Sequence, residues 1–140
     1  MQILRYISVV LIVISFNRCA STIAMYDQYA YAQVTSLKVD ALQVMGKADQ
    51  NYESSEKQVM EVDIKMRKAI EYEKHRPRNE IVNAMWLKLS DTDSFLYGGF
   101  IKRWQEKKKL EPSFIEDQKR VVGLAFDQIA ELESKMSKKK

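Results

Sequence analysis

Turn-forming residues are scarce in this sequence of 140 residues, which contains only 4 glycines and 2 prolines. A fold built from many β-strands needs a turn after nearly every strand, and glycine and proline form most of those turns. The sequence is instead rich in residues that favour the α-helix, among them Leu, Ala, Glu, Lys, Gln and Met. This composition argues against an all-β fold and predicts an all-α protein.

Cysteine and histidine occur once each, as Cys19 and His75. One cysteine cannot form an intrachain disulfide, and zinc sites need several Cys or His residues at fixed spacing. Carboxylate-bridged metal sites in helical bundles need Glu-x-x-His on two helices, but Tyr72 stands three residues before His75. Glu71 lies one turn before His75, although a solvated pair at a helix end explains this spacing better than a metal site. We therefore predict no metal and no cofactor.

Motifs for nucleophilic catalysis and phosphate binding are missing as well. A Ser-His-Asp or Cys-His site would have to use His75, which lies among the charged residues Glu73, Lys74 and Arg76. The pair Gly98-Gly99 lacks the glycine pattern of a phosphate loop, and no predicted strand precedes it. The sequence therefore predicts a protein that is not an enzyme.

Positive charge is not spread over the chain, although the formal net charge is +4. Arg5 and Arg18 belong to an apolar N-terminal segment, and four lysines lie close together near the C-terminus: Lys135, Lys138, Lys139 and Lys140. Together these six account for more than the whole excess, so the remaining body is mixed in charge and slightly acidic. Nucleic-acid binding needs a one-sided basic surface, and we predict no nucleic-acid partner.

The N-terminal segment 1–19 has the layout of a secretory signal. Arg5 precedes the run 7–16 (ISVVLIVISF), which is apolar apart from Ser8 and Ser15. A positive residue followed by a short apolar run is typical of such signals, and the run is shorter than the roughly 20 residues that span a bilayer. A buried N-terminal helix is the alternative, but it would concentrate its apolar residues on one face.

Two processing sites compete in this segment. Phe16-Asn17-Arg18-Cys19, followed by Ala20-Ser21, resembles a bacterial lipoprotein signal with Cys19 at the acylated position, although Arg18 stands where the pattern has a small residue. Thr22 and Ala24 instead offer small residues for an ordinary signal peptidase that cuts after Ala24. The chain thus resembles the small lipoproteins of Gram-negative bacteria. The resemblance implies a lipid anchor and a place in the cell envelope, facing the periplasm or the exterior; a secreted protein and an uncleaved anchor are the alternatives.

The body of the chain, 25–140, is predicted to be a single helical domain. Apolar residues recur every three or four positions over 30–44, and the stripe over 45–69 is shifted by one residue beside Gly46. One continuous helix over 26–75 would be about 75 Å long, which is too long for a compact domain. We therefore favour a break near 46–52 over one long helix, and Pro77 should end the unit.

The second half of the body predicts shorter helices and then a long one. Asn79 is expected to cap a helix, 95–104 to form a short helix interrupted at Gly98-Gly99, and Pro112 to begin a last helix with a stripe over 115–136. The predicted fold is a bundle of long helices with a short helical insertion at 79–109.

This insertion is the predicted partner surface, because it holds both tryptophans and a flexible Gly98-Gly99 pair. Trp86 shares an apolar stripe with its neighbours and is expected in the core. Aromatic residues at helical spacing more often belong to the core, but Tyr97 and Trp104 are the better candidates for exposure in this segment. There they would bind a partner together with Arg103 and Lys107, since aromatic and arginine side chains dominate many interfaces. A weaker candidate site for an anion consists of Lys74, Arg76 and Arg78.

These features favour a membrane-anchored, non-catalytic binding or scaffolding module of the bacterial cell envelope, with a lipid on Cys19 and another envelope protein as partner. The alternative is a soluble secreted or periplasmic protein of the inhibitor or immunity type. Tyr26, Tyr29 and Tyr31 surround the start of the first helix. With a lipid on Cys19 they would lie near the membrane, where tyrosine is favoured; packing against the bundle explains them equally well.

Overall fold

A computed structural model describes residues 24–135. The signal segment, Cys19 and the lysines at 138–140 lie outside the described residues. Within this range the chain forms helices and no strand, which confirms the predicted all-α fold. The α-helices are α2 (Gln28–Met45), α3 (Glu56–Lys74), α4 (Glu80–Ser90), α5 (Tyr97–Lys107) and α6 (Pro112–Lys135), and a 3-10 turn, η1 (Tyr52–Ser54), precedes α3.

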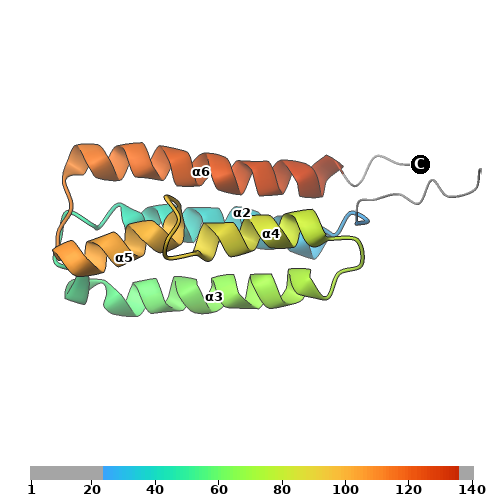
Figure 1. The fold of residues 1–140 in the computed structure, drawn as a ribbon, viewed down its shortest axis with the longest axis horizontal. Helices are drawn as coiled ribbons and strands as arrows, with labels where there is room; N and C mark the ends of the chain where they lie inside the picture. The colour runs from blue at the N-terminus through green and yellow to red at the C-terminus, as the bar shows by residue number, and fades with distance from the viewer. Residues whose placement is uncertain (1–23, 136–140) are drawn as a thin grey trace, which may run out of the picture.

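The helices form four antiparallel arms around one core (Figure 1). α2, α3 and α6 are one arm each, and α4 followed by α5 forms the remaining arm. α2 packs against α3 and α6, and α4 packs against the same two helices, so the ring of arms is closed. The segment 79–109 is therefore an integral arm of the bundle. The largest buried side chains of the core include Met45, Met66, Trp86, Trp104 and Phe126.

The predicted break between the first two apolar stripes is confirmed. α2 ends at Met45, the chain turns through 46–50, and α3 begins at Glu56. Gly46 has a φ of −62°, which any residue adopts, so the break does not depend on glycine. It is held by the backbone instead, because the Leu110 N–H donates to the Ala48 carbonyl at 2.8 Å. This turn sets the one-residue shift between the stripes of α2 and α3.

The joint between α4 and α5 is tightly packed, and the expectation of a flexible or interrupted helix at Gly98-Gly99 is wrong. Both glycines lie in the first turn of an unbroken α5. A Cβ on Gly98 would lie 2.2 Å from the Ser90 carbonyl oxygen, and one on Gly99 would lie 1.7 Å from the Ser94 carbonyl oxygen. The pair is glycine because the first turn of α5 lies directly against the backbone at the end of α4 and in the loop that follows it.

The predicted helix boundaries at the two prolines and the predicted N-cap position at Asn79 are confirmed, but the Asn79 side chain makes no capping hydrogen bond. α3 ends at Lys74, before Pro77, and Pro112 is the first residue of α6. Asn79 occupies the N-cap position of α4, and its carbonyl accepts from the Asn83 N–H at 2.9 Å. Its side-chain amide donates to the carboxylate and the backbone carbonyl of Glu73 instead. The Asn79 side chain is therefore oriented toward the buried Glu73 carboxylate and away from the N–H groups of the first turn of α4.

Candidate functional site

Tyr97 and Trp104 lie in the core, so the expectation that they are exposed is wrong. Trp104 is 0% exposed and Tyr97 is 1% exposed. The Trp104 indole N–H donates to the Gln50 carbonyl at 3.0 Å, and its ring meets Tyr52 edge to face. The physical reason is helical spacing: positions 97, 100, 101 and 104 form one face of α5, and that face is turned toward the bundle.

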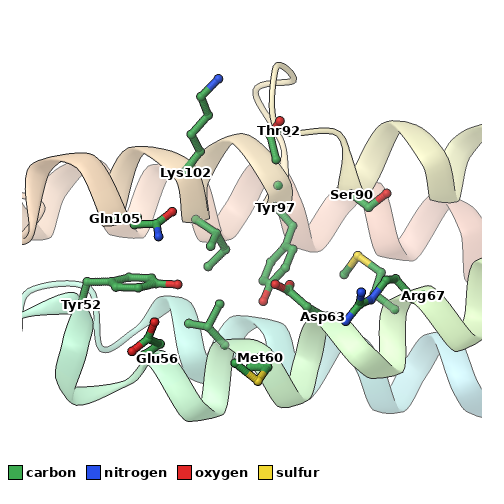
Figure 2. Close-up of a pocket in the computed structure, with 14 residues that line it drawn as sticks. Tyr52, Glu56, Met60, Asp63, Arg67, Ser90, Thr92, Tyr97, Lys102 and Gln105 are labelled. Atoms are coloured by element: carbon green, nitrogen blue, oxygen red, sulfur yellow. The ribbon is translucent and has the colours of Figure 1, made fainter.

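The other two residues of the predicted partner surface, Arg103 and Lys107, are exposed. The Arg103 guanidinium lies over the ring of Phe114 from α6, 4.6 Å from its centroid. Arg103 thus covers the joint between α5 and α6, whereas the buried Tyr97 points toward α3 (Figure 2). The four residues do not form one surface.

The predicted basic cluster is also divided. Lys74 and Arg78 are exposed, but the Arg76 side chain is only 9% exposed and turns into the bundle. Its guanidinium contacts Glu73 at 2.6 Å and Glu133 at 2.7 Å, and both glutamates are 1% exposed. Because Arg76 is neutralised by these carboxylates, it is not available to an external anion together with Lys74 and Arg78.

This buried cluster joins three segments at one end of the bundle. Arg76 also donates to the Met25 carbonyl at 2.9 Å, which ties the chain before α2 to the end of α3. Burial raises the pKa of Glu73, and Arg76 opposes that effect. Burial would lower the pKa of Arg76, but hydrogen bonds to Glu133 and Glu73 raise it overall, so the guanidinium stays charged. The cluster fixes the ends of helices and leaves little room for chemistry.

His75 and Glu71 form an exposed pair, with 2.9 Å between His75 Nε2 and Glu71 Oε1. Within residues 24–135, no three Asp, Glu, Cys or His side chains converge in the way that a metal ion requires. In the same range, no helix combines the length and the apolar character needed to cross a membrane.

A groove between α3 and the α4–α5 arm is the best candidate for a binding site (Figure 2). Its volume is about 570 Å³, within the range of roughly 300–1,000 Å³ that is usual for small-ligand sites. The two walls run antiparallel, with α3 on one side and the start of α5 on the other. Its lining comprises Tyr52, Glu56, Val59, Met60, Asp63, Met66, Arg67, Ser90, Thr92, Tyr97, Gly98, Ile101, Lys102 and Gln105.

The groove has an apolar floor and polar rims. Val59, Met66 and Ile101 are core residues whose edges form the floor. Met60 is exposed at the rim of α3. Such a combination of apolar contact area and a few converging polar groups is typical of binding sites.

Asp63 and Tyr97 face each other at the centre of the groove (Figure 2). The buried Tyr97 hydroxyl points at the Asp63 carboxylate but lacks the geometry of a formed hydrogen bond with any described residue. Burial raises the pKa of Asp63, while the nearby Tyr97 hydroxyl and Arg67 act in the opposite direction. Burial also raises the pKa of Tyr97, and the charge of Asp63 adds to this effect. The fold therefore places a carboxylate where its charge is poorly compensated, which is a common property of functional sites.

The remaining charged groups of the groove differ in whether they are already paired. Lys102 is bound to Asp93 at 2.9 Å and extends away from the groove in Figure 2. Within the described residues, Glu56, Asp63 and Arg67 make no ion pair, and the Tyr97 hydroxyl is the polar side chain that acts most strongly on the Asp63 carboxylate. These three groups remain available to a ligand.

One wall of this groove is visible in the sequence, although we did not predict it. Glu56, Met60, Asp63 and Arg67 recur at spacings of four, three and four, which places them on one side of α3. The opposite wall could not be predicted, because the sequence pattern of α5 does not show that this helix leaves a gap between itself and α3. The charged Glu133, four residues after the core residue Ile129, was a comparable signal for the buried cluster.

In comparisons with known proteins, no family model, no curated protein and no solved structure matches the chain.

Proposed function

We propose that this protein is a non-catalytic binding module of the bacterial cell envelope, held on a membrane by a lipid on Cys19. The observation that carries the binding role is the α3–α5 groove, which is lined by Asp63 and Arg67 without an ion pair among the described residues and by the buried Tyr97 hydroxyl without a formed hydrogen bond. A groove of this kind costs stability, because unpaired polar groups lose hydration on folding. A binding role would explain why such a groove is retained.

The position of the helix ends supports the anchored arrangement. α2 begins and α6 ends at the same end of the bundle (Figure 1), and Gln28 follows Cys19 by nine positions in the sequence. Exposed apolar and aromatic side chains occur on the segments at that end, among them Met25, Tyr26, Tyr29 and Ile81. Side chains of this kind suit the boundary between lipid and water. Tyr52 and Glu56, where the groove begins, lie at the opposite end.

The anchor is tested by replacing Cys19 with serine and separating membranes from the soluble fraction. We expect the wild type in the membrane pellet, with a lipid mass on its N-terminal peptide, and Cys19→Ser in the soluble fraction, because acyl chains contribute about 0.8 kcal/mol per buried CH₂. A wild type without lipid that is cut after Ala24 would instead favour the soluble inhibitor or immunity-type protein.

The binding role of the groove is tested with a matched pair of substitutions on α3. Met60→Arg puts a bulky charge at the rim of the groove, whereas Ile64→Arg introduces the same change one turn away, at an exposed position that does not line it. Tagged protein is used to capture partners from envelope extracts. We expect Met60→Arg to lose the captured partner and Ile64→Arg to retain it. Equal capture by both variants would place the partner surface elsewhere.

A further inference from the structure

We propose that the groove binds an organic cation, an alkylammonium or guanidinium group at the end of a hydrocarbon chain, with the charge held on the Asp63 carboxylate. This inference rests on the proposed binding function and names the chemistry of the ligand. It is carried by the unpaired carboxylate at the centre of the groove, the buried hydroxyl behind it and the apolar floor beside it.

The sign of the charge follows from the groups that surround the centre. Asp63 and Glu56 are both acidic and unpaired, and the oxygens of Tyr52 and Tyr97 lie close to them (Figure 2). After burial, the charges of Glu56 and Asp63 are the next causes that raise the pKa of Tyr52. The centre of the groove is therefore electronegative and attracts a cation.

The two basic residues of the lining do not reverse this sign. Lys102 is already paired with Asp93. Arg67 acts on Asp63 through its charge but is not within ion-pair distance of it. An anionic ligand could pair only with the Arg67 guanidinium among the lining residues and would be repelled by the carboxylates of Glu56 and Asp63.

The Tyr97 hydroxyl is a positioning group for Asp63. It is buried, it is aimed at the carboxylate, and it has no other acceptor among the described residues. A phenol in this position favours the ionised carboxylate, which is the form that attracts a cation. Burial alone would favour the protonated form, so the hydroxyl keeps the site charged at a lower pH than it would otherwise be.

The floor of the groove explains why the cation should carry a hydrocarbon chain. Val59, Met66 and Ile101 line the groove beside Asp63, and Met60 extends this apolar strip at the rim. Amphipathic chains of the lysine and arginine kind place their methylene groups on such surfaces while their charged ends meet a polar group. A free diamine and a basic side chain of a partner protein present the same chemistry.

The test is calorimetric titration of the whole chain, purified from cells in mild detergent. The probes are agmatine, cadaverine and a blocked pentapeptide with one central lysine, and glutarate is the anionic control. We expect saturable binding of the cations, with a dissociation constant in roughly the micromolar to millimolar range for a contact of this size, and no binding of glutarate. A peptide that binds more tightly than cadaverine indicates a protein partner, and the reverse order indicates a free amine.

Three variants assign the binding to the groove. Asp63→Asn should weaken the cation about tenfold or more, because it removes a charged acceptor. Glu61→Gln removes a carboxylate on α3 that does not line the groove and should change nothing. Tyr97→Phe should retain binding at high pH and lose it at a higher pH than the wild type, because the hydroxyl lowers the pKa of Asp63. Glu56, Arg67 and Lys102 are the other charged groups of the lining and are unchanged in this comparison.

The proposal is overturned if glutarate binds as well as the cations, if Asp63→Asn binds them like the wild type, or if none of them binds at about 10 mM, the weak limit of specific binding. Circular dichroism on each variant shows whether it is folded. Membrane location and Met60-dependent capture are measured separately. Failure of the cations with intact capture would therefore refute this ligand and leave the proposed function standing.

Discussion

At the scale of single residues, Arg76 constrains one end of the bundle through a buried ion-pair cluster. Its guanidinium bridges Glu73 and Glu133, both almost fully buried, and holds the Met25 carbonyl. Removing one partner of a buried ion pair leaves an uncompensated charge, which is far more costly than never having had the pair. The turn that precedes α4 therefore depends on one side chain.

We predict that Arg76→Met destabilises the protein by about 3–5 kcal/mol, the usual loss when a buried pair is broken. Lys74→Met is the control, because Lys74 belongs to the same turn but is exposed, and its ion pair with Glu71 is long, at 3.6 Å, and solvated. This substitution should change the free energy of unfolding by less than about 0.5 kcal/mol. Urea unfolding followed by circular dichroism measures both. Similar losses in the two variants would mean that the buried cluster contributes nothing specific.

For Asp63 we predict the opposite effect, because its negative charge destabilises the folded state. Burial raises its folded pKa above the unfolded value, which is about 3.9. Protonation of Asp63 therefore stabilises the folded state fully below about pH 4. This stabilisation is lost as the pH rises through the folded pKa. Asp63→Asn should melt a few degrees above the wild type at pH 7, and the difference should vanish near pH 3. A variant that melts below the wild type at pH 7 would contradict this sign.

At the scale of the helical elements, the α4–α5 arm is defined by its joint. Gly98 lets the first turn of α5 lie against the backbone at the end of α4, and Gly99 lets it lie against the Ser94 carbonyl in the loop between the two helices. The Cβ positions meet backbone oxygens, which cannot move aside as a flexible side chain could. The joint also fixes where the groove opens, since Ser90, Thr92 and Gly98 contribute to its lining.

We predict that Gly99→Ala is strongly destabilising, by about 3 kcal/mol or more, since overpacking against backbone exceeds the usual 1–3 kcal/mol of a core insertion. Gly46→Ala is the control. Its Cβ would have no neighbour closer than 3.5 Å and its φ suits any residue, so it should be neutral or slightly stabilising. Thermal melts of both variants measure these changes in stability, and a neutral Gly99→Ala would show that the joint is loosely packed.

The elements themselves were predictable from sequence to a large extent, for a clear physical reason. Helical periodicity, the prolines at positions 77 and 112 and the stripe shift beside Gly46 are local signals, and the structure follows each of them. Tyr97 and Trp104 were assigned wrongly because their burial depends on the facing arms of the bundle, which are distant in sequence. Asn79 was placed correctly at the N-cap, but its side chain binds Glu73, a buried carboxylate six residues before it, instead of capping α4. The groove is likewise a property of the distance between helices, which no local pattern contains.

At the scale of the whole molecule, the four arms form a closed ring around one core. Closure means that no arm is optional, including the split arm α4–α5, whose Trp86 and Trp104 are both central to the core. The membrane anchor and the binding groove stay proposals: the anchor would lie at the end where α2 begins and α6 ends, and the groove extends from the opposite end along one side of the bundle. The proposed cation would bind on a flank of the bundle, away from the lipid.

The shared end of α2 and α6 also has a mechanical consequence. Because the two helices run antiparallel and are the most extensive neighbours in the bundle, a force that separates residues 28 and 135 opens their interface from one end, turn by turn. A force between residues 50 and 135 must instead slide whole helices past each other. Optical-tweezers pulling should thus give a clearly lower rupture force in the first geometry, and equal forces would contradict this.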